Sequence, residues 1–432
     1  MISIENLIIG GGIAGLAVGL RLKEEQQEYL ILERNSYYGG LCSSFCIDGF
    51  IFDNFVHLSF TKNDLVRKYF DRTPFYAHIP NPYNYYHGMW IKHPAINNLY
   101  PLSDNEKHLV NNDLKLREKY ASKYHENYEY WLRYQFGDYF SDNFPLVYTR
   151  KYWQEEAKNI GTKWIGNRVY QPTYEEIMEG MKTSNTPVTY YAKEMRYPTH
   201  GGFESFIKGF AGGININLNE EVVAIDLIGK TVTTNKNVYS YQRLFSSLPL
   251  PEWTSLVLTC NKRDFTKFKE SIDNLHWTSG YMISLGMKGK IPRNDLWDYI
   301  YDEDIEVSRY YSPSIMSSNT VPQGCYSIQA EVYTRDGKSH RLPCNELLDS
   351  TIKKLDCIGA LRTQEVVVKD IKFSKYCNVL FDHEIYKNRE IVLNYLEHHD
   401  VISIGRFGLW DYYWSDQSFL SGYNATDGII TG

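Results

Sequence analysis

The chain has 432 residues, of which 43% are hydrophobic and 23% are charged. These fractions are ordinary for a globular protein, and the length predicts two or three domains, or one large domain with insertions. The net charge of −6 excludes a general nucleic-acid binder and a polybasic membrane anchor. Seven cysteines without regular spacing favour a reducing, cytoplasmic setting over a disulfide framework.

The N-terminal region lacks the pattern of a leader or of a membrane span. No basic start precedes an apolar core. The most apolar run, residues 7–20, contains several glycines and is shorter than the ~20 residues that a span needs. We therefore expect no membrane span.

The first fifty residues follow the order of a dinucleotide-binding unit. Residues 4–9 predict a short buried strand, residues 16–25 a helix, and residues 28–33 a second strand. The loop at 10–15 reads Gly-Gly-Gly-Ile-Ala-Gly, which fits the pattern G-x-G-x-x-G. This context predicts a Rossmann-like βαβ unit; a plain strand–turn–helix with structural glycines is the alternative.

Each part of this unit has a physical role in binding a dinucleotide. Gly10 makes the tight turn, Gly12 lets the backbone approach a pyrophosphate, and Gly15 lets helix and strand pack closely. The start of the helix offers unpaired N–H groups to the phosphates, and Glu33 can accept hydrogen bonds from ribose hydroxyls. The predicted cofactor residues of this unit are Gly10, Gly12, Ala14, Gly15, Glu33 and Arg34.

A second glycine pair and a segment near the C-terminus favour FAD over NAD. The pair Gly39-Gly40, followed by Leu41, lets the backbone lie along an extended cofactor. Residues 401–404 predict a strand that leads into Gly405 and Arg406, whose guanidinium can bind a phosphate in bidentate fashion. A surface ion pair is the alternative role for this arginine.

A helix predicted to begin near residues 415–418 would direct its positive dipole end at the flavin. Asp416, Gln417 and Ser418 stand at that start and complete the predicted cofactor residues. No residue is placed for a flavin thioether, so we expect non-covalent FAD.

Taken together, these residues resemble the FAD proteins grouped with amine oxidases, protoporphyrinogen oxidases and UDP-galactopyranose mutases. Further stretches, in the same order along the chain, are similar to the mutase branch. They are residues 49–53 with His57, residues 90–94 with 97–99, residues 164–169, Tyr299 with Arg309 and residues 312–313, and residues 405–412.

In that family, reduced FAD is a covalent catalyst whose N5 attacks the anomeric carbon of a nucleotide sugar and displaces UDP. The sugar ring opens and recloses in another size, without net oxidation. The resemblance implies that Arg168 and Arg309 hold the pyrophosphate, that Tyr299 and Tyr412 hydrogen-bond to it, and that His57 lies beside the flavin.

The resemblance also implies a backbone contact between Val223 and the adenine, a nucleotide-sugar substrate, and an external electron donor that reduces FAD. Two stretches depart from the family's pattern. Asn-Phe-Val replaces a glycine-containing sequence before His57, and His93 stands where a base-stacking aromatic is usual. An FAD oxidoreductase of amine-oxidase type therefore stays open as the alternative, and an FAD-bound protein with a structural role as a third possibility.

Residue chemistry leaves two of the arginine assignments open. Arg309 follows an acidic stretch, residues 302–306, and an ion pair there is its alternative role. Arg168 is alternatively a helix-end cation. We predict no metal site, because the cysteines and histidines lack ligand spacing.

The predicted fold is α/β, with a discontinuous FAD-binding domain of Rossmann type. Residues 1–75, 197–260 and 370–432 form this domain, residues 76–196 a mainly helical insertion, and residues 261–369 a substrate domain with a mixed or antiparallel sheet.

Overall fold

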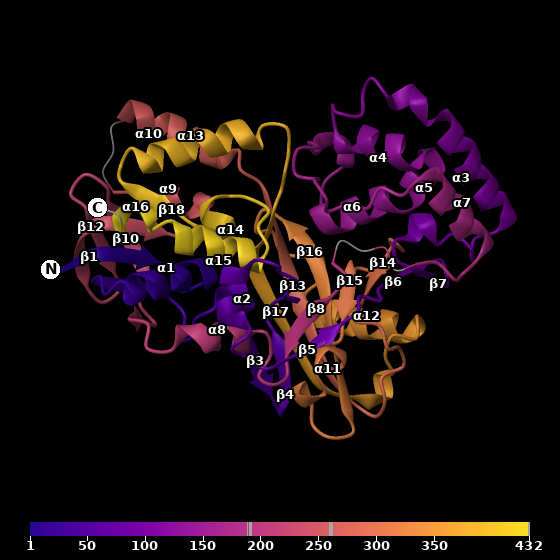
Figure 1. Cartoon of the computed structure of the whole chain (residues 1–432), viewed down its shortest axis with the longest axis horizontal. Coiled ribbons are helices and arrows are strands. Elements are labelled where there is room, and N and C mark those ends of the chain that lie inside the picture. The colour runs from indigo at the N-terminus through magenta and orange to yellow at the C-terminus, as the bar shows by residue number, and fades with distance from the viewer. Residues whose placement is uncertain (188, 190–191, 259–261, 431–432) are drawn as a thin grey trace.

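Two seven-stranded sheets and a lobe of helices make up the protein (Figure 1). The computed structural model describes residues 1–187, 189, 192–258 and 262–430. The helical lobe lies at one end of the molecule, and the N-terminus lies at the other end, beside the first sheet (Figure 1). Within the described residues, no helix combines the length and the apolar character needed to cross a bilayer.

The first sheet carries the predicted dinucleotide-binding unit. Its path runs β10-β11-β12-β1-β2-β9, and β18 pairs with β12. The pairings of β1 with β2 and with β12 are parallel, as the Rossmann prediction requires. The strands are β1 (Ile2–Ile9), β2 (Tyr29–Leu32), β9 (Ile216–Asn217), β10 (Val222–Asp226), β11 (Thr231–Thr234), β12 (Val238–Ser246) and β18 (Val401–Ser403).

Two glycines allow close packing beside this sheet, one of a helix on the loop after β1 and one of a helix on a helix. A Cβ on Gly15, in helix α1 (Ile13–Glu24), would lie 2.0 Å from the carbonyl oxygen of Gly10. A Cβ on Gly422, in helix α15 (Ser415–Asn424), would lie 2.0 Å from the carbonyl oxygen of Ala14. Helix α15 therefore packs directly on helix α1.

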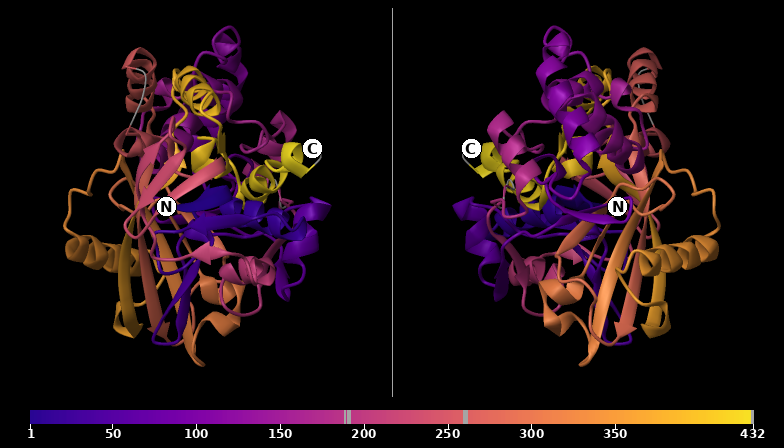
Figure 2. Two further views of the ribbon diagram at one scale, coloured as in Figure 1. Left: turned by 90° about the vertical axis from the view of Figure 1, so that its left-hand side faces the viewer. Right: turned by 90° about the vertical axis from the view of Figure 1, so that its right-hand side faces the viewer.

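The second sheet runs in the order β17-β13-β16-β15-β14-β6-β7. All its pairings are antiparallel except that of β14 with β6, so the sheet is mixed. In Figure 2 its long strands (orange) extend beyond the N-terminal unit (indigo), with helix α12 beside them. The strands are β6 (Tyr83–Tyr86), β7 (Met89–Lys92), β13 (Trp277–Lys288), β14 (Trp297–Ile300), β15 (Arg309–Tyr311), β16 (Cys325–Arg335) and β17 (Val366–Val379).

The helical lobe follows β7 in the chain. Two of its helices begin with a capping box, Ser103 with Glu106 and Thr173 with Glu176, which satisfies the first backbone N–H groups. Its helices are α3 (Asp104–Leu116), α4 (Tyr128–Phe136), α5 (Asp138–Asn143), α6 (Pro145–Trp153) and α7 (Tyr174–Lys182).

The remaining helices and two small hairpin-like sheets surround the two main sheets. The helices are α2 (Asp64–Phe70), α8 (Glu204–Ala211), α9 (Trp253–Leu256), α10 (Lys262–Asp273), α11 (Pro313–Met316), α12 (Cys344–Cys357), α13 (Ile385–Glu397), α14 (Gly405–Gly408) and α16 (Asp427–Ile430). The small sheets pair β3 (Ser44–Ile47) with β4 (Phe50–Asp53), and β5 (Phe75–His78) with β8 (Met195–Pro198).

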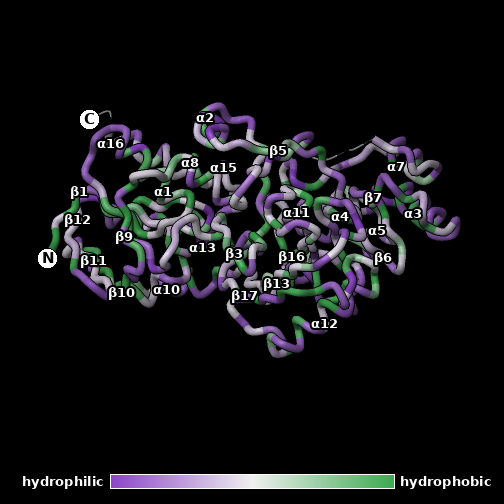
Figure 3. Tube along the Cα trace, turned by 90° about the horizontal axis from the view of Figure 1, so that it is seen from below, coloured by the Kyte–Doolittle hydropathy of each residue, from purple (hydrophilic) through white to green (hydrophobic). Residues whose placement is uncertain are grey.

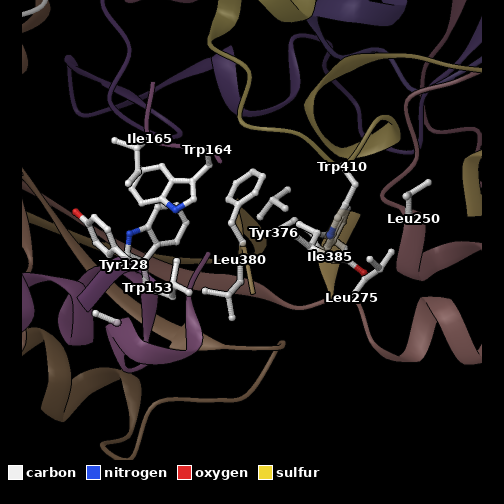
Figure 4. Packing of buried hydrophobic residues seen from close by; sticks show 14 of the residues in the cluster. Tyr128, Trp153, Trp164, Ile165, Leu250, Leu275, Tyr376, Leu380, Ile385 and Trp410 are labelled. Carbon is white, nitrogen blue, oxygen red and sulfur yellow. The ribbon is translucent and has the colours of Figure 1, made fainter. Parts of the chain in front are cut away.

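One hydrophobic core extends from the first sheet into the helical lobe. Hydrophobic stretches follow the inner strands, whereas outer helices such as α3 and α7 carry hydrophilic stretches (Figure 3). Trp153 and Trp164 have ring centroids 5.2 Å apart, and the cluster continues through Leu380 to Trp410 (Figure 4). The helical lobe is thus packed onto the rest of the protein and is not a loosely tethered module.

The sheet topology differs from the predicted domain boundaries in two places. Strands β6 and β7 lie inside the segment 76–196 that was predicted as mainly helical, yet they belong to the second sheet. Strand β17 crosses the predicted boundary at residue 370 and pairs throughout with β13 of the second sheet. The predicted boundary at 260/261 lies outside the described residues.

Candidate functional site

A cavity of about 1260 Å³ lies where the two sheets and the helical lobe meet. We call one part of its wall the glycine side; it comprises Gly10, Gly12, Ala14, Glu33, Arg34, Gly39, Gly40, Leu41, Val223, Gly405 and Arg406. We call another part the aromatic side; it comprises Tyr128, Tyr148, Tyr152, Trp153, Trp164, Arg168, Tyr299, Tyr301, Tyr333 and Tyr412. Elements that are far apart in the sequence thus share one cavity.

The glycine loop has the geometry that a bound dinucleotide needs. Gly10 has φ +99°, which suits the tight turn. A Cβ on Gly12 would meet nothing within 4 Å, so this backbone faces open space in the cavity. The amide of Gly39 donates to the carbonyl oxygen of Gly11 at 2.8 Å, which brings the second glycine pair against the first loop.

Glu33 is held so that part of its carboxylate can still accept hydrogen bonds. Its Oε2 accepts from the Gly11 amide at 2.8 Å, and its Oε1 accepts from the backbone and side-chain nitrogens of Asn35. A carboxylate offers about four acceptor positions, so one can still take a ribose hydroxyl. Arg34 is exposed at the rim of the same side.

The C-terminal segment closes the glycine side, as predicted. A Cβ on Gly405 would lie 2.9 Å from that of Ala14, so no larger residue fits at this contact. Arg406 donates through Nη2 to Oδ1 of Asn378 at 2.7 Å, and its buried Nε has no hydrogen-bond partner among the described residues. Such an unpartnered donor at the cavity wall fits an anionic or acceptor-rich ligand.

Three predicted cofactor residues do not line the cavity. Gly15 packs against Gly10, which is the packing role predicted for it. Gln417 accepts from the amide of Trp414 at 3.0 Å, and Asp416 accepts from the amide of Gln417, so both side chains cap the start of α15. Ser418 does line the cavity.

Arg168 presents a guanidinium to the cavity. It donates to the carbonyl oxygens of Trp164 (3.1 Å) and Tyr412 (2.7 Å), and its guanidinium lies over the rings of Tyr412 and Trp414. Its Nε is buried without a partner, and no carboxylate pairs with it in the described part of the chain. The side chain is therefore a positioned, unneutralised cation.

Arg309 also lines the cavity, but its charge is balanced from behind. Its Nε and Nη2 donate to the two oxygens of Glu331 at 3.0 and 2.8 Å. Glu331 is fully buried and also accepts from the hydroxyl of Tyr333 at 2.8 Å. The alternative of an ion pair with the acidic stretch 302–306 is wrong, because β15 pairs with β16 and so places Arg309 opposite Glu331.

Two histidines of the wall are neutral at pH 7. Burial lowers the pKa of His57 to about 4, and its Nδ1 donates to the carbonyl oxygen of Phe55 at 2.8 Å. Its Nε2 is therefore an acceptor. Burial also lowers the pKa of His93 to about 3, and the ring of His93 lies 4.7 Å from that of Tyr299.

The two predicted tyrosines lie on the aromatic side. The ring of Tyr299 meets that of Tyr148 edge-on at 5.4 Å. The guanidinium groups of Arg168 and Arg406 lie 4.8 and 5.1 Å from the centre of the Tyr412 ring. Tyr412 thus stands between the two arginines.

Sequence reasoning did not identify several residues of this site. Glu331 and Asn378 are each one of several polar residues in a long strand, and no local pattern distinguishes them. Tyr148 and Tyr152 are one helical turn apart on α6, which is a spacing that was detectable.

Cys42 lines the cavity, and burial raises the pKa of its thiol to about 12, which makes it a thiol and not a reactive thiolate at neutral pH. Among the described residues, no group of three or more His, Cys, Asp and Glu side chains is arranged to hold a metal ion.

A search against family models matches residues 8–73 to the NAD(P)-binding Rossmann-like domain. A curated relative, an uncharacterized protein encoded in the nifH2 3′ region of Methanothermococcus thermolithotrophicus, is 41% identical over 58 residues. That match spans 13% of this chain and 56% of the relative.

The similar solved structures cover nearly the whole chain. A reduced UDP-galactopyranose mutase superposes with a TM-score of 0.90 and 24% identity over 99% of this chain and 96% of that one. The chain has the fold of UDP-galactopyranose mutase. A protein from Exiguobacterium sp. 255-15 named as a protoporphyrinogen oxidase gives a TM-score of 0.75 with 15% identity, and a putrescine oxidase gives 0.66 with 12%; each match covers 100% of both chains.

The resemblance read from the motifs is thus confirmed at the level of the fold. The superposition on the mutase covers 99% of this chain and so includes the Rossmann unit, the helical lobe and the second sheet.

Proposed function

We propose that the protein is an FAD-dependent mutase that interconverts ring forms of a nucleotide sugar. FAD would bind non-covalently on the glycine side, and the nucleotide sugar on the aromatic side. An external donor would supply the electrons that keep FAD reduced, because the ring interconversion itself oxidises nothing.

Arg168 is the observation that carries this proposal. It is a guanidinium on the aromatic side with only carbonyl oxygens and rings as partners among the described residues. Arg309 lines the same cavity, but Glu331 behind it neutralises its charge, so Arg168 supplies the unneutralised positive charge on this side. That charge is complementary to the two negative charges of a nucleoside diphosphate sugar.

The fit of FAD rests on the glycine side. Gly12 leaves room for a pyrophosphate, Glu33 keeps an acceptor position, and the Nε of Arg406 has no partner among the described residues. When bound and reduced, FAD would supply a nucleophilic ring nitrogen. Val223 lines the same side and would contact the adenine.

The chain's own residues would then act on the leaving diphosphate. Arg168 and Arg309 stabilise the negative charge that develops as the sugar–phosphate bond breaks, and they are held in advance by Tyr412 and Glu331. Neutral His57 offers an acceptor nitrogen beside the site and adds no charge. The aromatic walls exclude water from the reactive sugar.

The test is an incubation of dithionite-reduced protein with UDP-, dTDP- and GDP-sugars, with products separated by chromatography and identified by NMR, since ring isomers have equal mass. We expect interconversion by reduced protein only, and a loss of at least 10-fold in Arg168→Ala. Lys163→Ala, which changes an exposed neighbouring cation, is the matched control. No interconversion with any sugar would contradict the proposal.

Phe55 and Val56 favour a second candidate, an FAD oxidoreductase. Both residues line the cavity next to His57 and add apolar surface where the mutase family has glycine. An apolar and aromatic wall suits an uncharged organic reductant. This candidate predicts bleaching of the oxidised flavin by its substrate and formation of peroxide in air.

A further inference from the structure

Asn378 lies between the two sides of the cavity and contacts both. It is 4% exposed, stands near the end of β17 and lines the cavity. Its Oδ1 accepts from Nη2 of Arg406 at 2.7 Å and from the hydroxyl of Tyr152 at 3.0 Å. Its Nδ2 donates to Oγ1 of Thr278 at 3.1 Å, which determines the orientation of the amide.

The two donors to Asn378 belong to different sides: Arg406 to the glycine side and Tyr152 to the aromatic side. Arg406 follows Gly405, whose backbone lies against Ala14 of the dinucleotide loop. Tyr152 belongs to α6 of the helical lobe, and its ring lies 4.9 Å from that of Tyr333. One amide oxygen thus joins the glycine side to the aromatic side.

A neutral amide suits this position better than a carboxylate does. In the described part of the chain, Arg406 has no acidic partner; it donates to Asn378 and, at 3.3 Å, to the carbonyl oxygen of Tyr413. The amide orients the guanidinium but leaves its charge available to a ligand. Glu331 does the opposite for Arg309, because its carboxylate neutralises the cation that it orients.

We propose that Asn378 is a positioning residue that couples cofactor binding on the glycine side to ligand binding on the aromatic side. The inference rests on the proposed function for the identity of the two ligands. A ligand that engages Arg406 orders the amide, and the amide orders Tyr152. By reciprocity, a ligand that engages the aromatic side strengthens the cofactor site by the same factor.

The decisive experiment is a double-mutant cycle on the affinity of the apoprotein for FAD, measured by quenching of flavin fluorescence. The four proteins are wild type, Tyr152→Phe, Asn378→Leu and the double variant. We expect Asn378→Leu to weaken FAD binding roughly 10-fold, because it removes a charge-assisted bond that orients Arg406. Tyr152→Phe should weaken it severalfold in wild type and not at all in the Asn378→Leu background.

Two further variants separate positioning from folding. Asn388→Leu removes a buried asparagine on α13, which does not line the cavity, and it should leave FAD affinity unchanged. Asn378→Asp keeps the acceptor oxygen, so Tyr152→Phe should still weaken FAD binding in that background. The proposal would be overturned if Tyr152→Phe and Asn378→Leu had additive effects on FAD affinity. It would also be overturned if Asn378→Leu and Asn388→Leu changed FAD affinity equally.

A second titration, of UDP, dTDP and GDP into the FAD-loaded proteins, distinguishes this failure from that of the proposed function. Weaker nucleotide binding in Asn378→Leu, relative to wild type, supports the coupling. A non-additive FAD cycle with no nucleotide binding to wild type would leave the coupling intact and contradict the mutase. An additive FAD cycle overturns the coupling, whatever the nucleotides do.

Discussion

Gly12 and Gly15 belong to one motif but have opposite surroundings. A Cβ on Gly12 meets open space, whereas a Cβ on Gly15 would lie 2.0 Å from a backbone oxygen. Gly12→Val should therefore abolish FAD binding while the melting temperature of the apoprotein changes little. Gly15→Ala should lower the melting temperature by several degrees, because the backbone must move. Calorimetry and FAD titration check both.

The outcome for Gly12→Val separates a binding loop from a structural one. Retained FAD affinity would show that the pyrophosphate does not approach this backbone. A large drop in the stability of the apoprotein would show that Gly12 is needed for the fold itself and not only for binding FAD.

Arg309 has a structural role in addition to the one proposed for ligand binding. Arg309→Ala leaves the fully buried Glu331 without its cation, and such a change costs about 3–5 kcal/mol. We expect a clear fall in the free energy of unfolding, measured by denaturant titration at pH 7. The fall should shrink at pH 5, because an unpaired buried carboxylate has a raised pKa and takes up a proton.

Two controls accompany this variant. The double variant Arg309→Leu/Glu331→Leu should recover most of the stability but not the ligand affinity, since it removes both buried charges. Arg168→Ala should lose ligand affinity at little cost in stability, because it leaves no carboxylate unpaired among the described residues. Equal stability losses in Arg168→Ala and Arg309→Ala would contradict this division of roles.

At the scale of elements, Lys151 attaches the helical lobe to the second sheet. Its ammonium, buried on α6, donates to the carbonyl oxygens of Ile300 (2.7 Å), the last residue of β14, and Asp302 (2.9 Å), two residues farther on. The carbonyl oxygen of Lys151 accepts from the hydroxyl of Ser308 at 3.1 Å. This contact sets α6, with Tyr148 and Tyr152, relative to the strand that carries Tyr299.

Burial lowers the pKa of Lys151 to about 7, and this gives a stability prediction with a definite sign. In the unfolded chain the pKa of a lysine is about 10.4. Between pH 7 and 10 the unfolded state therefore binds more protons, so this group makes stability rise with pH. The denaturant midpoint of wild type, relative to that of Lys151→Met, should rise across this range.

Arg150→Met is the control for this prediction. It removes the partly exposed cation next in sequence, which pairs with exposed Glu303, and it should parallel wild type at every pH. The prediction would be contradicted if the difference in denaturant midpoint between wild type and Lys151→Met stayed constant from pH 7 to 10.

The elements that sequence predicted best are those with a local physical signal. The βαβ unit has its glycines, its apolar strands and its terminal acid within 33 residues, and the structure places β1, α1 and β2 there. Strands β6 and β7 were missed because their tyrosines and Trp90 gave no alternation that distinguishes them from the aromatic helices that follow. The pairing of β6 with β14 is a long-range contact, and β7 joins the sheet through β6.

The site follows the same rule: residues with a local sequence signal were predictable, and long-range contacts were not. Arg168, Arg309, Tyr299 and Tyr412 line the cavity and belong to recognisable motifs, so the sequence pointed to them, whereas Tyr148 and Tyr152 were not identified. The partners of Arg309 and Arg406, which are Glu331 and Asn378, lie on strands that come together only through the antiparallel register of the second sheet. Neither the neutralised charge of Arg309 nor the available charge of Arg406 was detectable before that register was known.

For the whole molecule, the cavity is the meeting place of three parts that are each incomplete alone. The first sheet supplies the glycine side, the second sheet supplies Arg309 and Asn378, and the helical lobe supplies Tyr148 and Tyr152. One hydrophobic cluster contains residues of all three parts, so packing positions the walls of the cavity relative to one another (Figure 4).

This arrangement predicts two separate patterns of protection in hydrogen exchange. FAD should slow exchange in the segments 10–15, 39–42 and 405–409, which contain most residues of the glycine side. Adding UDP to the FAD-loaded protein should slow exchange in residues 164–170, the loop that carries Arg168. The physical reason is that a ligand at 100 times its Kd adds about 2.7 kcal/mol to the free energy of any opening that releases it.

The turn at residues 227–230 is the internal control, because it is outside the cavity wall and Ile228 is 67% exposed. Neither FAD nor UDP should change the rate of hydrogen exchange in this turn. Arg168→Ala should abolish the UDP pattern and keep the FAD pattern, and Gly12→Val should abolish the FAD pattern. UDP protection confined to residues 10–15 would mean that the nucleotide competes for the dinucleotide loop, and the aromatic side would then not be the nucleotide site.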